Sequence, residues 1–127
     1  KLGGTNFTYH IIKQLPIIPL DKYSSEVTES LKKKLIELTY TSCDLKPFAK
    51  DIGYSGEPYA WDEDRRLTVS SEIDAIYAHL YEITNDDLDY ILETFPIVKR
   101  KNIEQYNEYR TKRIIREKYE ELKPMFQ

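Results

Sequence analysis

The chain has 127 residues, of which 40% are hydrophobic and 32% are charged, and its net charge is −3. This length fits one domain that is large enough to bury its own core. The composition is typical of a soluble globular domain, and no apolar run approaches the roughly 20 residues of a membrane-spanning helix. We therefore expect a cytoplasmic protein without a membrane segment.

Three further features of the sequence limit the class of protein. The first twenty residues lack the continuous apolar stretch and the cleavage site of a signal peptide. The single cysteine, Cys43, excludes an internal disulfide and a paired-cysteine zinc site. The chain opens on Lys1, and its only methionine is Met125, so we expect a fragment of a longer polypeptide.

The N-terminal segment is predicted to hold a Gly turn, a short helix and an extended stretch. Gly3 and Gly4 form the turn, and Thr5 or Asn6 is the expected N-cap of the short helix. Two prolines then interrupt residues 15–20, where an extended path is expected because proline cannot continue a helix. No other segment is predicted to be extended.

Helical spacing and capping residues predict the rest of the chain. The first predicted helix runs from Ser24 or Ser25 to Tyr40, with the apolar stripe Val27, Leu31, Leu35 and Leu38 opposite a solvated lysine run at residues 32–34, and a short helix containing Phe48 follows, capped by Asp44 and stopped by Gly53. The next helix is capped by Asp62 and has the inward-facing residues Val69, Ile73, Ile76, Tyr77 and Leu80; the one after it is capped by Thr84, has the stripe Leu88, Ile91, Leu92 and Phe95, and is ended by Pro96. A final helix is predicted over residues 103–122, with the contact residues Ile103, Tyr106, Ile114, Ile115, Tyr119 and Leu122. The predicted fold is mainly α, with five to six helices in an irregular bundle.

The residue types of a catalytic or metal site do not gather anywhere in the sequence. There is no glycine-rich phosphate loop, nucleophile elbow, His-x-x-x-His pair or calcium loop. His10, His79 and Cys43 each lack a partner nearby in sequence, so packing or structural roles are favoured. The acidic run at residues 62–64 is best explained by a helix N-terminus, which favours negative charge. We predict no catalytic, cofactor or metal site.

Charge is distributed unevenly along the chain. Residues 57–93 contain eleven acidic and two basic side chains, a net charge of −9, whereas residues 99–118 contain eight basic and three acidic ones, a net charge of +5. The basic third indicates either an anionic partner or the acidic part of the same molecule. The candidate DNA-contacting residues are Lys99, Arg100, Lys101, Arg110, Lys112, Arg113 and Arg116.

Two interpretations of these cations stay open. Tyr106, Tyr109, Arg110 and Arg113 can share one face of a continuous helix, and arginine with tyrosine is typical of a surface that contacts phosphates. Alternatively, the basic helix is solvated and joined to the acidic helices by ion pairs. Stacking of Tyr54, Tyr59 or Trp61 on an unpaired base is a weaker possibility than packing.

Several motifs in sequence order resemble one protein family. They occur at residues 38–49, 51–54, 58, 61–66, 72–81, 90–96, 99–101 and 108–113. Together they resemble the C-terminal region of type II restriction–modification enzymes with an adenine-specific DNA methylase domain. The opening segment, with Gly3-Gly4-Thr5-Asn6 and residues 15–19, resembles the end of a target-recognition domain. Cys43 stands where the family pattern has an aromatic residue.

The resemblance implies a domain division and a parent enzyme. Residues 1–20 would end a target-recognition domain, and residues 21–127 would form a C-terminal helical domain. The parent would methylate adenine with S-adenosylmethionine, and a restriction activity in the same polypeptide stays open. Its partners would be DNA and the upstream methylase and recognition domains. Neither the cofactor-binding glycine motif nor the Asn/Asp-Pro-Pro-aromatic motif occurs here, so this part is expected to support DNA target recognition without catalysis. A purely structural docking module is the alternative.

Overall fold

The computed structural model describes residues 8–127, and this part of the chain is helical and contains no strand. The predicted mainly α class is confirmed. The α-helices are α1 (Tyr9–Ile12), α2 (Ser25–Thr39), α3 (Lys46–Asp51), α4 (Glu63–Leu80), α5 (Asn85–Glu93), α6 (Pro96–Tyr106) and α7 (Arg110–Leu122), and the 3-10 helices are η1 (Leu20–Lys22), η2 (Cys43–Leu45) and η3 (Lys123–Phe126).

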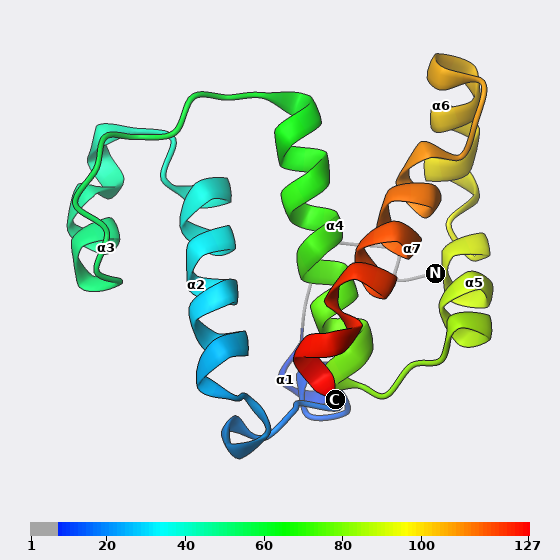
Figure 1. The fold of residues 1–127 in the computed structure, drawn as a ribbon, viewed down its shortest axis with the longest axis horizontal. Coiled ribbons are helices and arrows are strands. Elements are labelled where there is room, and N and C mark those ends of the chain that lie inside the picture. The colour runs from blue at the N-terminus through cyan, green and yellow to red at the C-terminus, as the bar shows by residue number, and fades with distance from the viewer. Residues whose placement is uncertain (1–7) are drawn as a thin grey trace.

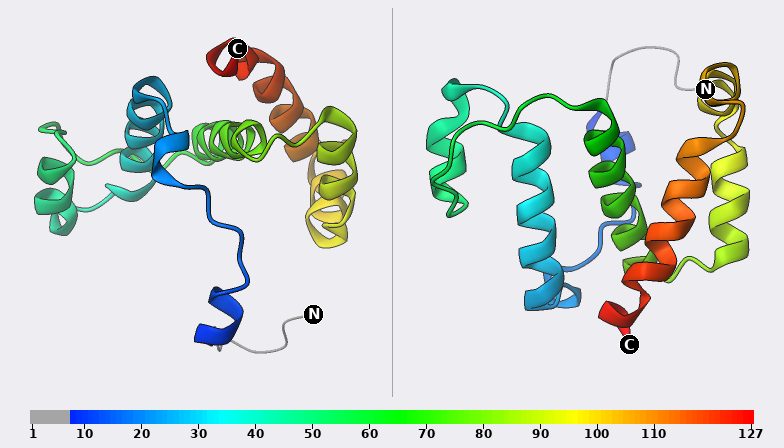
Figure 2. Two further views of the ribbon diagram at one scale, coloured as in Figure 1. Left: turned by 90° about the horizontal axis from the view of Figure 1, so that it is seen from below. Right: turned by 45° about the horizontal axis from the view of Figure 1, so that its top comes forward.

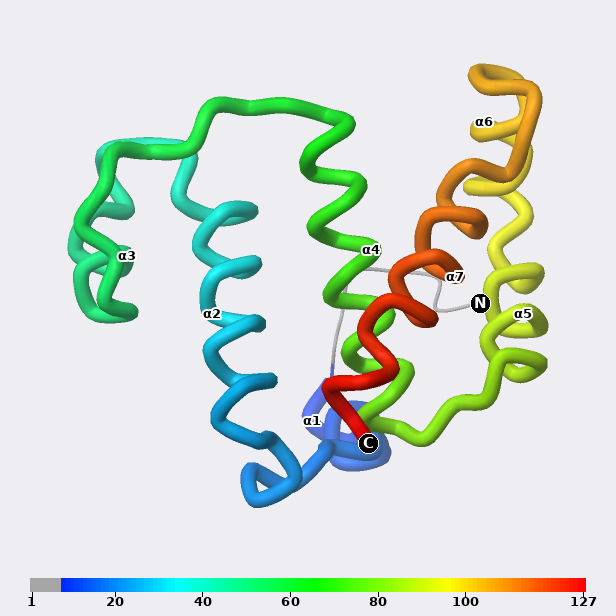
Figure 3. Tube along the Cα trace, in the orientation of Figure 1, coloured from blue at the N-terminus to red at the C-terminus, as the bar shows by residue number. Residues whose placement is uncertain are grey.

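The helices stand side by side rather than around one central core. Helices α3, α2 and α4 form a row, α7 packs on α4, and α5 and α6 follow one another along the far side of α7 (Figure 1). The tube in Figure 3 makes the same path visible, with α6 continuing beyond the end of α5. Such an arrangement leaves many helix faces without a neighbour.

Three of the predicted helix starts are confirmed by their capping hydrogen bonds. The Ser24 hydroxyl accepts the Val27 N–H at 3.1 Å, and Asp62 accepts the Arg65 N–H at 2.7 Å. Thr84 forms a capping box with its partner three residues later, in which each side chain accepts the other's N–H. These caps satisfy donors that have no acceptor inside the helix, which explains why short polar residues stand at these points.

Other predicted boundaries differ from the structure. Ser42, not Asp44, provides the capping side chain before α3, because its hydroxyl accepts the Asp44 N–H at the start of η2. Pro96 begins α6 rather than only ending α5, since the first turn of a helix needs no N–H from this residue. The predicted cap at Thr5 or Asn6 lies outside the described residues. In the described part of the chain, Thr8 directly precedes α1.

The predicted helix over residues 103–122 is divided into α6 and α7. Asn107 has a left-handed backbone with φ of 56°, and this conformation ends α6. Asparagine tolerates this region better than most residues, so it commonly stands at helix C-termini. Because the chain changes direction here, residues 103–106 do not continue the buried stripe of α7.

The core consists of three small hydrophobic clusters. One joins α4, α5 and α7 and is built from Ala75, Ala78, Leu88, Leu92, Ile115 and Tyr119. A second joins α2 to α4 through Val27, Leu31 and Ile76, and a third joins α2 to α3 through Ile36, Tyr40 and Ala49. Helix α4 takes part in the first two clusters and is therefore the centre of the fold.

The buried face of α2 differs in part from the predicted stripe. Val27 and Leu31 are buried as predicted, but Ile36 is buried in place of Leu35, which is 45% exposed. The reason is that α2 lies between α4 and α3, so its two ends bury different faces. For the same reason Lys34 turns toward α4 instead of the solvent.

The segment before α2 is attached to the helices near Pro16 and Ile18, and its first part projects away from them. Ile18 is buried and the Tyr81 hydroxyl donates a 2.7 Å hydrogen bond to the Pro16 carbonyl, but α1 buries none of its residues. Figure 2 shows α1 standing apart from the row of helices. We call residues 8–20 the N-terminal arm. No helix among the described residues has the length and hydropathy that crossing a membrane requires.

Candidate functional site

Helix α7 carries most of the predicted basic cluster. It forms because Ile114, Ile115 and Tyr119 recur at helical spacing and are buried against α4 and α5. The basic side chains flank this stripe, so they lie at the edges of the contact rather than on a free face. Arg110, Lys112 and Arg116 lie near acidic side chains of α4 and α5, whereas Arg113 lies near acidic side chains in and just before α7.

Two of these cations bind carboxylates across helices. The Arg110 guanidinium is 2.8 Å from Asp64 at the start of α4 and lies 4.6 Å above the centre of the Tyr106 ring. The Lys112 amine is 2.9 Å from Glu93 and 3.6 Å from Asp89, both on α5. The hydrogen bond that Lys112 donates to Glu93 raises the pKa of Lys112, which keeps this amine charged.

The next two cations are also paired within the chain. Arg113 donates two hydrogen bonds, of 3.0 and 3.1 Å, to Glu108 and a third of 2.9 Å to Glu117. These contacts raise the pKa of Arg113 above its ordinary value. Arg116 lies 3.3 Å from Asp89, so Asp89 is shared between two cations of α7.

Helix α6 holds the remaining three candidates and pairs them less completely. Lys99 is 2.6 Å from Glu93, whereas the contact between Arg100 and Glu104 is 3.8 Å long and both side chains are largely exposed. Among the residues that the structure describes, Lys101 has no carboxylate within 4 Å. Six of the seven candidates are thus in ion pairs, and Lys101 is the exception.

The predicted shared face of tyrosines and arginines is only partly present. Tyr106 and Arg110 meet, as the cation–π contact indicates. Tyr109 turns toward α5, where its hydroxyl donates to the Leu92 carbonyl at 2.9 Å, and burial raises its pKa. The break at Asn107 separates these residues, so the four side chains do not form one continuous surface.

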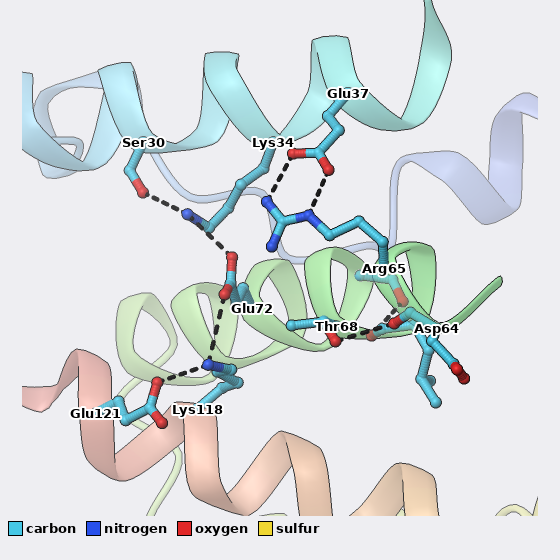
Figure 4. Close-up of polar contacts among 11 residues, drawn as sticks. Ser30, Lys34, Glu37, Asp64, Arg65, Thr68, Glu72, Lys118 and Glu121 are labelled. Atoms are coloured by element: carbon cyan, nitrogen blue, oxygen red, sulfur yellow. Dashed lines mark hydrogen bonds and ion pairs between the residues drawn. The ribbon is translucent and has the colours of Figure 1, made fainter. Parts of the chain in front are cut away.

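Sequence reasoning missed a polar network that joins α2, α4 and α7. Glu72 of α4 lies 3.3 Å from Lys34 of α2 and 3.6 Å from Lys118 of α7 (Figure 4). Lys34 also donates to Ser30, and Lys118 lies 2.7 Å from Glu121. The three side chains at the centre are each at most 20% exposed. No local pattern marks this network, because its members are brought together only by helix packing.

The start of α4 is held to α2 by two arginines. Arg65 donates to both carboxylate oxygens of Glu37, and this contact lowers the pKa of Glu37. Arg66 donates to the Leu38 carbonyl at 2.9 Å and covers one face of the Trp61 ring at 3.8 Å. One face of Trp61 is therefore already occupied.

The remaining aromatic and histidine candidates are also engaged. Tyr54 and Tyr59 stack on each other with ring centres 5.3 Å apart, so these loop aromatics serve packing. His79 lies between the rings of Tyr119 and Phe126. Its Nε2 donates to the Tyr119 carbonyl at 2.8 Å, because a carbonyl oxygen can only accept.

Cys43 is exposed, and no group of three His, Cys, Asp or Glu side chains within residues 8–127 is arranged to hold a metal ion. What the described side chains form is therefore an ion-paired helix surface. Comparison of the chain with models of protein families, with curated proteins and with solved structures finds no match.

Proposed function

We propose that this chain is a non-catalytic helical docking module of a larger adenine-specific restriction–modification methyltransferase. In this role it would hold the target-recognition domain in position and so support DNA recognition without contacting DNA itself. The parent would use S-adenosylmethionine and act in the cytoplasm on DNA. The ordered motifs in residues 38–113 support the parentage, and the all-helical fold is compatible with it.

One observation favours a docking role rather than direct contact with DNA. Six of the seven candidate cations are bound to carboxylates of the same chain, as described above. A phosphate would have to compete with these carboxylates for each cation. Exposed ion pairs contribute only about 0–1 kcal/mol each, but the carboxylates stay in place and repel an approaching phosphate. A helix paired in this way favours a structural role.

The N-terminal arm provides a surface through which the module can attach to an upstream domain. Tyr9, Ile17 and Leu20 are largely exposed, although they belong to apolar types that normally pack. The arm is fixed to the helices at Pro16 and Ile18. We infer that the recognition domain covers the exposed apolar side chains of the arm.

A DNA titration tests the docking role. Binding of a duplex to this chain is measured by fluorescence anisotropy between about 50 and 200 mM salt. We expect weak binding with a shallow salt dependence, and no loss of DNA methylation when the parent carries Lys99→Glu, Arg100→Glu, Arg110→Glu and Arg113→Glu together. A steep dependence that these changes abolish, with methylation lost as well, would contradict the docking role.

Direct phosphate contact by α6 is the second candidate function, and Lys101 is the observation that favours it. Its amine has no carboxylate partner among the described residues, and Arg100 beside it is 70% exposed. Two phosphate contacts would give a slope of roughly −2 in a plot of log affinity against log salt. Lys101→Glu should then weaken binding, whereas Lys33→Glu on the exposed side of α2 should not.

The parentage has its own test, which does not depend on either surface. The coding sequence that precedes Lys1 is determined and searched for the methylase motifs. An Asn/Asp-Pro-Pro-aromatic motif with a glycine-rich cofactor motif in the same reading frame supports the proposal. A different upstream domain removes the methyltransferase parent but leaves the docking surfaces to be tested separately.

A further inference from the structure

An apolar groove lies between α4 and α5, with one side chain of α7 at its floor. Its volume is about 240 Å³. Its lining includes Asp74 and Tyr77 of α4, Ile91 of α5, Phe95 after α5, and Ile115 of α7. We call this feature the α4–α5 groove. Nine of its ten lining residues are aliphatic or aromatic, so contact with water is unfavourable.

The groove exposes side chains that the amphipathic pattern of α5 assigns to a core. The stripe Leu88, Ile91, Leu92 and Phe95 has the spacing of a buried helix face. Leu88 and Leu92 are buried, but Ile91 is 36% and Phe95 51% exposed. The fold therefore buries Leu88 and Leu92 of this stripe, whereas Ile91 and Phe95 stay partly exposed in the groove.

Asp74 is the one charged residue in the lining of the groove. No Lys, Arg or His lies within 4 Å of its carboxylate among the described residues, in contrast to Asp64 and Asp89. Asp74 is exposed at the edge of the groove, and the atoms around its carboxylate raise its pKa through partial desolvation. An ionised carboxylate beside apolar side chains is stabilised by a cation that arrives together with apolar surface.

Helix α6 carries complementary groups. It has eleven residues and buries none of them, although an isolated helix of this length is marginal in water. Ile97, Val98 and Lys101 are related by three and four positions, so they lie on one face, which we call the α6 face. Ile97 is 62% exposed, and Lys101 is the candidate cation without a carboxylate partner.

The groove and the α6 face adjoin each other at Phe95. This residue lines the groove and also contributes to the shallow apolar surface formed with residues 96–98. Within residues 8–127, an apolar groove with an unpaired carboxylate thus lies next to an apolar helix face with an unpaired amine. The two charges do not pair within one chain, since no contact within 4 Å joins them.

We propose that two copies of this chain form a two-fold symmetric dimer in which the α6 face of each copy occupies the α4–α5 groove of the other. Lys101 of each copy pairs with Asp74 of its partner, and Ile97 packs against Tyr77 and Phe95. A two-fold axis makes both contacts identical and closes the assembly at two copies. Charge complementarity identifies the occupant as a second copy, because the same chain carries both halves of the contact. This dimer does not depend on the proposed function.

Sedimentation velocity of the 127-residue chain over a concentration range tests the dimer. We expect a reversible monomer–dimer equilibrium that Phe95→Glu or Ile97→Glu weakens at least tenfold. Tyr90→Glu is the matched control, because Tyr90 is 74% exposed on α5 but does not line the groove. Circular dichroism of each variant verifies that the helices are retained. A chain that stays monomeric up to about 1 mM overturns the proposal, as does a dimer that Phe95→Glu leaves unchanged.

A charge exchange tests the pairing itself. Asp74→Lys alone and Lys101→Glu alone should each weaken self-association about tenfold, since like charges then face each other twice. Mixing the two variants should restore dimers, because each mixed pair contains two opposite-charge contacts. Mixed dimers no stronger than either variant alone would overturn the pairing. The proposed docking role is measured by DNA binding and methylation, so the two ideas fail independently.

Discussion

Helices α6 and α7 are consecutive in the chain and both are rich in basic residues, yet they are held in the fold in different ways. Helix α7 buries Ile114, Ile115 and Tyr119, and most of its cations bind carboxylates of α4 and α5. Helix α6 buries no residue, and Lys101 has no carboxylate partner in the described part of the chain. Basic composition therefore does not by itself identify a ligand-binding surface. The pairing state of each cation separates a helix used for packing from one available to a partner.

Truncation of one apolar side chain in each helix, buried in α7 and exposed in α6, should give the largest difference. Ile115→Ala truncates a side chain that is 2% exposed, and the resulting cavity should lower the free energy of unfolding by about 2–5 kcal/mol. Ile103→Ala on α6 should change it by less than about 0.5 kcal/mol. Urea denaturation followed by circular dichroism measures both. Equal losses would remove the distinction between the two helices.

Neutralising a carboxylate of the central network should have the next largest effect. Glu72→Gln leaves the amines of Lys34 and Lys118 without their shared anion, while both stay mostly buried. We expect a loss of about 1–3 kcal/mol, between the values of exposed and fully buried ion pairs. Glu104→Gln, which removes the exposed contact to Arg100, is the control and should change stability by less than about 0.5 kcal/mol. A neutral result for Glu72→Gln would mean that the network contributes little.

The turn that separates the two helices should show a smaller effect. Asn107→Ala places a residue that disfavours φ of 56° at the end of α6, at a cost of about 1 kcal/mol. Asn107→Gly should be close to neutral, because glycine adopts this conformation freely. Gln105→Ala, inside α6, serves as the control. Thermal unfolding of the three variants measures the order, and a destabilised glycine variant would point to a role of the Asn107 side chain instead.

The ion pairs of the basic helices should give the smallest effect, seen as a pH dependence. Lys99 and Lys112 lower the pKa of Glu93 below its ordinary value of 4.5, and Arg113 lowers that of Glu108. A lowered folded-state pKa stabilises the fold above the ordinary value, and this contribution is lost as the pH falls through the folded-state pKa. Glu93→Gln should therefore be less stable than the original chain near pH 7 and equal to it in strong acid. Unfolding curves at both ends of this range measure the difference, and equal stability of the two proteins near pH 7 would contradict the expected contribution of these ion pairs.

Local features of the fold were predictable from the sequence because they depend on residues within one or two helical turns. Ser24, Asp62 and Thr84 cap their helices as predicted, and the stripe residues Val69 and Ile76 are buried. Capping needs only a short polar side chain and an N–H three residues later. The interpretation of the basic cluster as ion-paired was also among the predictions, since acidic residues interleave with it.

Other features of the candidate surfaces could not be predicted in this way. Lys34 was predicted to be solvated, but it meets Glu72 because α2 lies beside α4. Ile91 and Phe95 have the spacing of core residues, yet they stay 36% and 51% exposed among the described residues. Periodicity identifies which face of a helix is apolar, but it does not identify the neighbour that covers that face.

The sequence by itself determined the helical class, the main caps, part of the apolar faces and the uneven charge of this protein. Each of these follows from backbone propensity and from spacing along a helix of 3.6 residues per turn. Only the tertiary structure decided which cations are paired, where the chain turns between α6 and α7, and which apolar faces stay open. Those properties depend on contacts between residues far apart in the chain, such as Glu72 with Lys118, and no local pattern encodes such contacts.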